Sequence, residues 1–333
     1  MKHALALLAA VFSLGWSPAF AQKEIRVATF TPPQSVTVRT ALKPFIDAVN
    51  KEVGDEVQLR GYFGGSLSRN PKKYYDLVRD GITDIGYFDP GYSPGRFKDF
   101  GLFELPFLAR NGTEASLAMW RMYEQGLLDG LDEIKVIATF ATDLYQIHTS
   151  KPVKTVYDLQ GMKLRAAAPM HAEALRALNG VPIGLPITQT TEALSRGVVQ
   201  GALTGFSTLV TFRMLPVVKY HYEIPLGVVP VAIGMNTNSW KKLSPRVQTA
   251  INKHSGIVIS RGGGGGFDAA GKLAKAKIQS DKDHHYQPMT EQEMKRGEQW
   301  AKPIYRKWMS EVRDGQRKFD AFVEILADIR AGR

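Results

Sequence analysis

The sequence predicts an α/β protein built of two domains, and three observations support that prediction. Strand-like and helix-like stretches alternate along two separate parts of the chain, as in sheets covered by helices. The chain has 333 residues, more than one hydrophobic core usually serves. It has no cysteine, so cores rather than disulfides or thiolate chemistry must stabilise the fold.

The N-terminus has the three parts of a secretory signal peptide. Lys2 precedes an apolar run from Ala4 to Trp16, and Ala19-Phe20-Ala21 is an A-x-A cleavage site. The apolar run is shorter than the ~20 residues that a membrane-spanning helix needs. We therefore expect residues 1–21 to be removed on export and the mature chain to be soluble. An uncleaved membrane anchor is the alternative, and the small residues at the cleavage site disfavour it.

The first α/β unit follows directly. Residues 24–30 alternate apolar and polar side chains and predict a strand, and residues 57–63 predict a second one. Between them, residues 35–53 have apolar side chains at helical spacing. A helix over 71–80 and a strand over 82–87 continue the alternation, which predicts a parallel sheet.

A second α/β unit follows a helical stretch over 113–128. Its expected elements are a strand-rich segment at 134–147, strands at 162–165 and 181–185, and helices at 170–178 and 188–197. Residues 228–235 are apolar enough for a buried strand, and helical periodicity dominates after Pro245.

An unbroken glycine run, Gly262–Gly266, interrupts that helical region. Each interior glycine destabilises a helix by ~1 kcal/mol relative to alanine. The run therefore indicates either a kinked or loosened helix or the very close approach of a neighbouring backbone, and the sequence leaves both open.

The formal net charge of +11 favours anionic partners. Lys and Arg are scattered among Asp and Glu, without the basic run or the motif of a nucleic-acid-binding protein. Anionic small molecules are the better prediction, and we expect no nucleic-acid partner.

Three motifs look catalytic or ligand-binding but lack the chemistry. Gly91–Gly95 matches G-x-S-x-G, yet Pro94 has no N–H for an oxyanion hole, so a turn is the better interpretation. The glycine run lacks the preceding strand of a dinucleotide site. The adjacent His284 and His285 point to different sides and have no third ligand at metal spacing, so a solvated pair is the default. We expect no cofactor and no metal.

Aromatic residues gather in segments at predicted strand ends, and ligands of open α/β sheets bind beyond the carboxyl ends of the strands. Any one of these residues is more often core than pocket, but the set predicts a partly apolar pocket. The set comprises Phe30, Tyr87, Phe88, Tyr92, Phe140, Tyr145 and Phe206.

The segment Asp158–Arg165 resembles the D-L-x-G-x-K-x-R signature of periplasmic solute-binding proteins that serve TRAP transporters, the DctP type. Further pieces similar to that family occur in the expected order and span the mature chain. They are Phe63–Leu67, Val78–Ile85, Glu104–Leu108, Ala193–Gly201 and Met235–Asn236 before Trp240.

The resemblance implies a two-lobed periplasmic-binding-protein fold, with a long helix that braces both lobes and a hinge that closes on ligand. We expect lobe I to comprise residues 22–145 plus about 231–265, and lobe II residues 146–230 plus about 266–333. The resemblance also implies that Arg165 pairs with a substrate carboxylate, since guanidinium donors match two carboxylate oxygens. A lone arginine without the motif would more often form a surface or interdomain salt bridge.

Two departures from the family pattern bear on the ligand. Tyr145 stands where many members have a second arginine, and Thr204 stands where they often have asparagine. Both changes reduce polarity, so we expect a monocarboxylate with an aromatic or apolar body rather than a dicarboxylate. We expect Tyr145, Thr204, Tyr87, Phe88, Phe206 and Phe30 to shape the pocket around Arg165.

The function implied is that of a monomeric periplasmic protein, without enzymatic activity, that captures a small organic acid and delivers it to membrane permease subunits. A binding protein of an ABC importer is one alternative. An exported hydrolase is a weaker one, because no nucleophile, metal set or pair of carboxylates can be assembled from the sequence.

Overall fold

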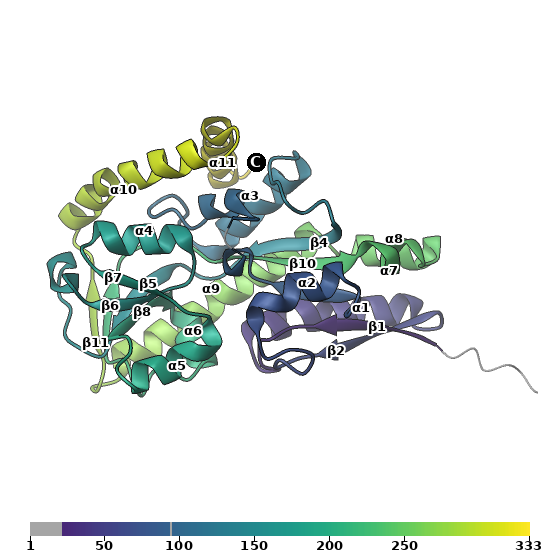
Figure 1. Cartoon of the computed structure of the whole chain (residues 1–333), viewed down its shortest axis with the longest axis horizontal. Coiled ribbons are helices and arrows are strands. Elements are labelled where there is room, and N and C mark those ends of the chain that lie inside the picture. The colour runs from purple at the N-terminus through teal and green to yellow at the C-terminus, as the bar shows by residue number, and fades with distance from the viewer. Residues whose placement is uncertain (1–21, 94) are drawn as a thin grey trace, which may run out of the picture.

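The strands of the computed structural model form two separate sheets, each with helices packed on it (Figure 1). The structure describes residues 22–93 and 95–333, so the predicted signal peptide lies outside the described residues. We call the five-stranded sheet with its helices the first lobe and the six-stranded sheet with its helices the second lobe.

The five-stranded sheet has the order β2-β1-β3-β10-β4, and the six-stranded sheet has the order β11-β9-β5-β8-β6-β7. The strands of the first are β1 (Lys23–Ala28), β2 (Val57–Tyr62), β3 (Ile85–Phe88), β4 (Ile134–Ala141) and β10 (Pro230–Asn236). Those of the second are β5 (Tyr145–Thr149), β6 (Lys163–Ala166), β7 (Val181–Gly184), β8 (Gly201–Gly205), β9 (Tyr220–Glu223) and β11 (His285–Pro288).

Both sheets are mixed, and the prediction of parallel sheets is wrong for one strand in each. β10 runs antiparallel to β3 and β4, and β5 runs antiparallel to β8 and β9. These are the two strands that enter directly from the other sheet, β5 after residues 142–144 and β10 after residues 224–229. A parallel neighbour needs a long crossover back to the start of the sheet, which such short connections do not provide.

Helices cover both sheets and fall close to the segments that the periodicity predicts. In the first lobe they are the π-helical turn η1 (Val38–Leu42), α1 (Lys43–Val53), the 3₁₀ turn η2 (Pro71–Lys73), α2 (Tyr74–Arg79), the 3₁₀ turns η3 (Pro90–Tyr92) and η4 (Lys98–Leu102), α3 (Gly112–Glu124), α7 (Thr237–Lys241) and α8 (Pro245–Lys253). In the second they are the 3₁₀ turn η5 (Val156–Leu159), α4 (Pro169–Ala177), α5 (Ile187–Ser195) and α6 (Phe206–Thr211). Side-chain caps begin some of them: Asn111 accepts from the Glu114 N–H at 2.8 Å at the start of α3.

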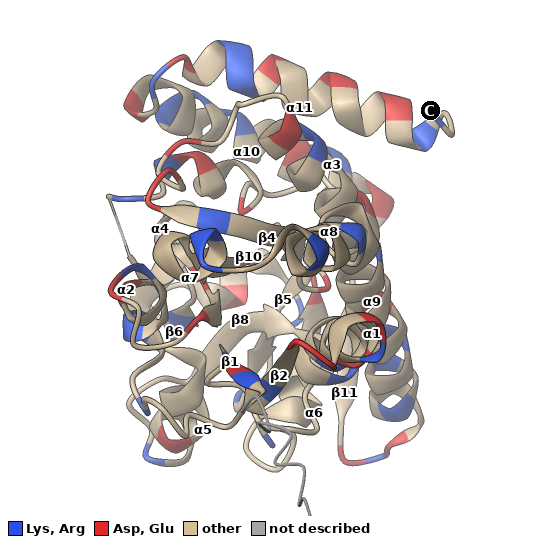
Figure 2. Ribbon diagram, turned by 90° about the vertical axis from the view of Figure 1, so that its right-hand side faces the viewer, with Lys and Arg blue, Asp and Glu red and all other residues tan. Residues whose placement is uncertain are grey.

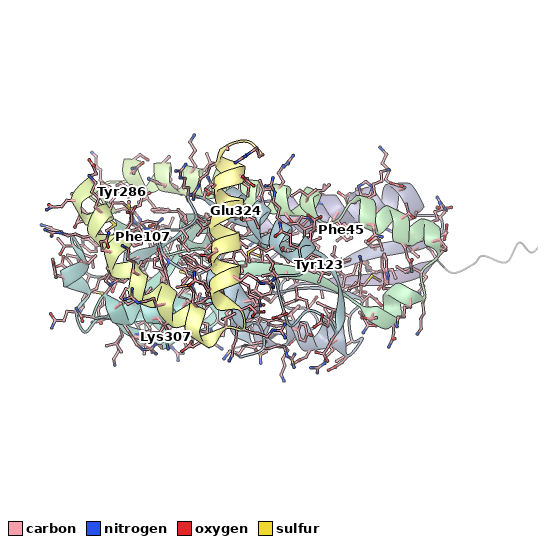
Figure 3. The ribbon with its side chains drawn as sticks, turned by 90° about the horizontal axis from the view of Figure 1, so that it is seen from above. Phe45, Phe107, Tyr123, Tyr286, Lys307 and Glu324 are labelled. Carbon is pink, nitrogen blue, oxygen red and sulfur yellow. The ribbon has the colours of Figure 1, made fainter. Side chains whose placement is uncertain are left out.

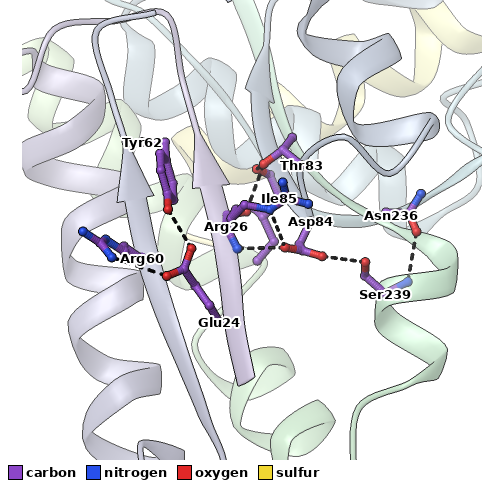
Figure 4. Close-up of polar contacts among 9 residues, drawn as sticks. All are labelled: Glu24, Arg26, Arg60, Tyr62, Thr83, Asp84, Ile85, Asn236 and Ser239. Carbon is purple, nitrogen blue, oxygen red and sulfur yellow. Dashed lines mark hydrogen bonds and ion pairs between the residues drawn. The ribbon is translucent and has the colours of Figure 1, made fainter. Parts of the chain in front are cut away.

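A network around Asp84 fastens β1 and α7 to the start of β3 (Figure 4). Its carboxylate accepts from the Arg26 N–H at 2.8 Å and from the Ser239 hydroxyl at 2.7 Å. Asn236, in turn, accepts from the Ser239 N–H at 2.9 Å and so caps α7. Two interior strands of the first sheet, β1 and β3, are thereby tied to the chain that follows β10.

The long helix α9 (Ile257–Ser280) touches both lobes. It packs on η1, α3 and β4 of the first lobe and on α6 and β11 of the second (Figure 1). Two more helices, α10 (Glu291–Glu311) and α11 (Gly315–Arg330), close the chain. None of the described helices is long and apolar enough to cross a membrane.

The last helix lies on the first lobe, although we expected residues after about 266 to belong with the second. α10 packs on α4 of the second lobe, whereas α11 packs on α3 of the first. α11 buries Phe322 against Phe103 of the first lobe, with ring centroids 5.1 Å apart, and its buried Lys318 amine lies 2.8 Å from both Asp99 and Asp129. Figure 3 looks onto α11, where Glu324 faces solvent, and Figure 2 shows charges of both signs interspersed along α10 and α11.

The glycine run lies inside α9, and the close approach of neighbouring groups explains it. A Cβ on Gly264 would lie 2.8 Å from the Gly112 carbonyl oxygen of α3, and one on Gly263 would lie 2.6 Å from the Phe140 ring of β4. On Gly266 it would lie 2.5 Å from the Thr40 Cβ of η1. The run therefore lets α9 approach the first lobe more closely than any side chain allows.

This explanation predicts opposite effects for two neighbouring substitutions. Gly264→Ala should lower the free energy of unfolding by about 1–3 kcal/mol, because the new methyl overpacks against α3. Gly265→Ala is the matched control, because a Cβ at this position would lie 3.8 Å from its nearest neighbour, the Thr113 Oγ1 atom, which is an ordinary contact. It should raise the free energy of unfolding by up to ~1 kcal/mol through helix propensity. Urea unfolding measures both, and a Gly264→Ala variant as stable as Gly265→Ala would refute the close-packing account.

Candidate functional site

A cavity lies between the two lobes and is lined by residues of both. The first lobe contributes Phe30, Thr31, Ser35, Val36, Thr37, Tyr87, Asp89 and Tyr92. The second lobe, the connecting segments and α9 contribute Thr142, Tyr145, Ile187, Thr208, Thr211, Phe212, Val229 and Phe267. Nine of these sixteen residues are aromatic or apolar, and the other seven are Thr, Ser or Asp.

The strand order explains why these residues meet. β1 and β3 are parallel neighbours, so their carboxyl ends open at the same edge of the sheet. Phe30 follows β1 and Asp89 follows β3 at that edge. Tyr145 begins β5 immediately after the chain has crossed to the second lobe.

Arg165 is fully buried on β6 behind this cavity. Its Nε donates to the Leu185 carbonyl at 2.9 Å and its Nη1 to the Leu203 carbonyl at 3.1 Å. Within the described part of the chain no Asp or Glu forms an ion pair with it, although a buried charge ordinarily needs a partner. Arg165 does not itself line the cavity, but its charge acts on Asp89, Tyr92 and Tyr145, which do.

Two carboxyl groups lie buried next to each other, and one of them, Asp89, is close enough to Arg165 to feel its charge. Burial raises the pKa of Asp89 to about 7, against the opposing effects of the Gly91 N–H and the Arg165 charge. Burial and the neighbouring Asp89 raise the pKa of Glu104 to about 8, although its carboxylate accepts from the Met170 N–H. Near neutral pH both groups hold protons part of the time.

Polar atoms without partners also surround Arg165. His171, fully buried on α4, stacks on Tyr145 with ring centroids 5.2 Å apart, and neither ring nitrogen makes a hydrogen bond. Burial, followed by the Arg165 charge, lowers the pKa of His171 to about 3, so its ring is neutral. The Thr204 hydroxyl lies near the Tyr145 phenol but is not aligned for a hydrogen bond. Buried polar atoms normally have partners, so these atoms are candidates to contact a ligand.

The lobes contact each other through hydrogen bonds at the cavity. The Ile187 N–H, at the start of α5, donates to the Tyr92 hydroxyl oxygen at 2.9 Å. The Met170 N–H of α4 donates to Glu104 at 3.1 Å. In both cases a side chain of the first lobe satisfies a helix N-terminus of the second.

The structure brings together some of the predicted pocket residues and separates others. Phe30, Tyr87 and Tyr145 line the cavity, and Thr204 adjoins it through Tyr145. Phe88 instead packs in the core of the first lobe against Tyr75 and Phe97. It points away because successive strand residues face opposite sides of the sheet.

Phe206 is also absent from the cavity lining. Its ring packs edge-on against His148, with ring centroids 4.9 Å apart.

Sequence reasoning missed Asp89 and His171 as site residues. Asp89 could have been found, since it is the first polar residue after a predicted strand; for His171 no sequence pattern pointed to the pocket.

Three histidines form a hydrogen-bonded chain in the second lobe. His148 Nδ1 lies 2.8 Å from His221 Nδ1, and His221 Nε2 lies 2.8 Å from His284 Nδ1. His148 Nε2 lies 3.1 Å from the Thr204 carbonyl oxygen. The prediction of a solvated histidine pair is therefore wrong for His284, whose side chain is buried, while the exposed His285 stacks on Tyr220. Among the described residues no three His, Asp or Glu side chains are arranged to hold a metal ion.

Comparisons with known proteins agree with this architecture. Residues 27–311 match the family described as bacterial extracellular solute-binding protein, family 7, or DctP. A curated relative, the 2,3-diketo-L-gulonate-binding periplasmic protein YiaO of Escherichia coli, is 23% identical over 222 residues, 66% of this chain and 67% of that protein.

Two solved structures superpose over nearly the whole chain. A TRAP solute-binding protein from Rhodoferax ferrireducens, crystallised with copurified benzoate, is 26% identical with a TM-score of 0.88, covering 93% of this chain and 99% of its own. A marine metagenome TRAP solute-binding protein specific for aromatic acid ligands, in complex with metahydroxyphenylacetate, is 23% identical with a TM-score of 0.87, covering 92% and 99%. The family match over most of its length shows that this two-lobed chain belongs to the DctP family of bacterial extracellular solute-binding proteins, those of TRAP transporters.

Proposed function

We propose that the protein captures a small monocarboxylate with an aromatic or apolar body between its lobes and delivers it to the membrane subunits of a TRAP transporter. The observation that carries the proposal is the fully buried Arg165 guanidinium beside an aromatic-lined cavity. It donates to two backbone carbonyls but forms no ion pair with a described Asp or Glu side chain. A ligand carboxylate would supply the missing counter-charge.

The surroundings of Arg165 support a single carboxylate on the ligand. A dicarboxylate would need a second cation to pair with its second carboxylate. Tyr145, which faces the Arg165 guanidinium, stands where many family members have that second arginine. Phe30, Tyr87 and Phe212 line the cavity and offer apolar surface to the remainder of the molecule. The aromatic acids bound by the Rhodoferax and marine proteins have this chemistry.

Binding without catalysis is part of the proposal. The family and the Rhodoferax neighbour are described as solute-binding proteins, which supports this part. Turnover of esters or amides by the purified protein would contradict this part.

The lobes must part for a ligand to reach Arg165, which is fully buried. The two hydrogen bonds from helix N-termini to Tyr92 and Glu104 are the contacts that opening would break. This supports a hinged capture mechanism and a released, closed complex as the form that meets the permease.

A thermal-shift screen of organic acids tests the proposal most directly. An aromatic monocarboxylate at 100 times its Kd should stabilise the protein by about 2.7 kcal/mol. Dicarboxylates of similar size should stabilise it less. A screen in which only dicarboxylates or sugars bind would contradict the proposed ligand class.

Arg165→Ala should weaken binding of an aromatic monocarboxylate at least about thirtyfold, because loss of one partner leaves the other charge buried and unpaired, a cost of ~2–5 kcal/mol. Arg165→Lys should restore only part of the affinity, since a point charge cannot make the two-pronged contact. Calorimetry on variants with native circular dichroism measures both. Near-wild-type affinity in a folded Arg165→Ala variant would place the carboxylate elsewhere.

Thr204→Val removes a buried hydroxyl that has no partner in the ligand-free protein. The free energy of unfolding without ligand should stay equal or rise, while affinity should fall about threefold to tenfold if the hydroxyl bonds to the ligand. Thr139→Val on β4 is the matched control, since its hydroxyl is likewise buried and unpaired, whereas only the Thr204 hydroxyl is placed next to the Tyr145 phenol that lines the cavity. It should leave affinity unchanged; equal affinity for both variants would exclude a ligand contact at Thr204.

A further inference from the structure

The charges buried around Arg165 do not balance once a ligand carboxylate arrives. Asp89 and Glu104 are 6% and 1% exposed, and Arg165 is 0% exposed. A Cβ on Gly91 would lie 3.1 Å from Asp89 Oδ1 and 3.4 Å from Glu104 Oε1, so the two carboxyl groups flank the same glycine. With a ligand bound, its carboxylate and Asp89 would share one guanidinium, with Glu104 next to Asp89, and an uncompensated buried charge is strongly unfavourable.

The other groups that face Asp89 cannot supply a second positive charge. They are Arg165 on β6, Glu104 after η4, and the phenols of Tyr87 on β3, Tyr92 on η3 and Tyr145 on β5. His171, which faces Arg165, stays neutral. The lysines nearest in the adjoining crevices, Lys72 and Lys98, are exposed to solvent.

Asp89 is the acid that faces the ligand. Its side chain lines the cavity, whereas that of Glu104 does not. Its Oδ1 accepts from the Gly91 N–H at 2.8 Å, which leaves Oδ2 without a hydrogen bond inside the described part of the chain. An ionised Oδ2 would repel a ligand carboxylate held by Arg165, and a protonated one can donate to it.

We propose that Asp89 is a second ligand-contacting residue, which binds as a neutral acid and donates its proton into a hydrogen bond with the ligand, so that capture takes up a proton from the buffer. This inference rests on the proposed function, because it needs a carboxylate at Arg165. It adds that the site recognises the carboxylate with one cation and one acid, and that affinity depends on pH.

The direction of the pH dependence follows from the two states of the protein. In the ligand-free protein Arg165 lowers the pKa of Asp89, which burial raises to about 7. A ligand carboxylate neutralises Arg165, so the pKa of Asp89 is higher in the complex. The complex therefore holds the proton more tightly, and affinity is constant below about pH 7 and falls above it, by up to about tenfold per pH unit.

Calorimetry with benzoate or mandelate, whichever binds more tightly, tests this in phosphate and in Tris. Both acids stay ionised between pH 6 and pH 8, so they take up no protons themselves. The difference between the binding heats in the two buffers therefore gives the number of protons that the protein takes up. We expect net proton uptake that increases from pH 6 to pH 8, because Asp89 becomes more ionised in the protein without ligand over that range. Uptake near zero at both pH values would overturn the inference while leaving the proposed function intact.

Two neutral variants assign the proton. Asp89→Asn keeps an oxygen for the Gly91 N–H, and it should abolish both the uptake and the fall in affinity above pH 7. Glu104→Gln is the matched control, because it removes the neighbouring acid and keeps an oxygen for the Met170 N–H; it should retain both effects. Uptake that persists in Asp89→Asn and vanishes in Glu104→Gln would assign the proton to Glu104 and refute the proposal. If wild-type protein bound no aromatic monocarboxylate, the proposed function itself would fail, and this inference with it.

Discussion

A guanidinium held in the protein interior by two backbone carbonyls is the constraint on which the site depends. Leu203 lies on β8 and Leu185 just beyond β7, so the two strands that flank β6 hold Arg165 from either side. Backbone carbonyls orient a guanidinium but carry no net charge to neutralise it. The second sheet therefore places a positive charge at the interface between lobes and leaves its neutralisation to whatever enters there. The aromatic lining, the protonated acids and the neutral imidazole are all compatible with that single charge.

The connection between the lobes has an equally simple physical basis. Two chain segments cross from sheet to sheet, and they are hydrogen-bonded to each other: the Thr142 N–H donates to the Val229 carbonyl at 3.1 Å, and the Tyr145 N–H donates to the Gly227 carbonyl at 2.8 Å. α9 runs beside them, with glycines against the first lobe and larger residues beyond. The crossing is thus a paired ribbon backed by a helix, which is far stiffer than two separate linkers would be.

Much of this architecture could be predicted from the sequence, and what escaped prediction has identifiable causes. Apolar periodicity located many of the strands and helices within a few residues, because each element buries one face, but it did not predict β8, β9, β11 or α6. It could not show that β5 and β10 run antiparallel, since direction depends on which sheet a strand joins. Motif similarity pointed to Arg165, but the place of Phe88 depended on a one-residue alternation at the end of β3. The acids at 89 and 104 come together only through the fold, so their coupling left no pattern in the sequence.

The histidine chain has a consequence for the second lobe. The Thr204 carbonyl can only accept, so His148 must carry its proton on Nε2 and must accept at Nδ1. His221 then donates from Nδ1 and accepts at Nε2, and His284 donates from Nδ1. One carbonyl oxygen on β8 thereby selects the tautomer of three rings in succession. No ring can change its tautomer or flip by itself without breaking a hydrogen bond of this chain. The chain therefore couples β5, β9 and the segment before β11 to the position of the Thr204 carbonyl.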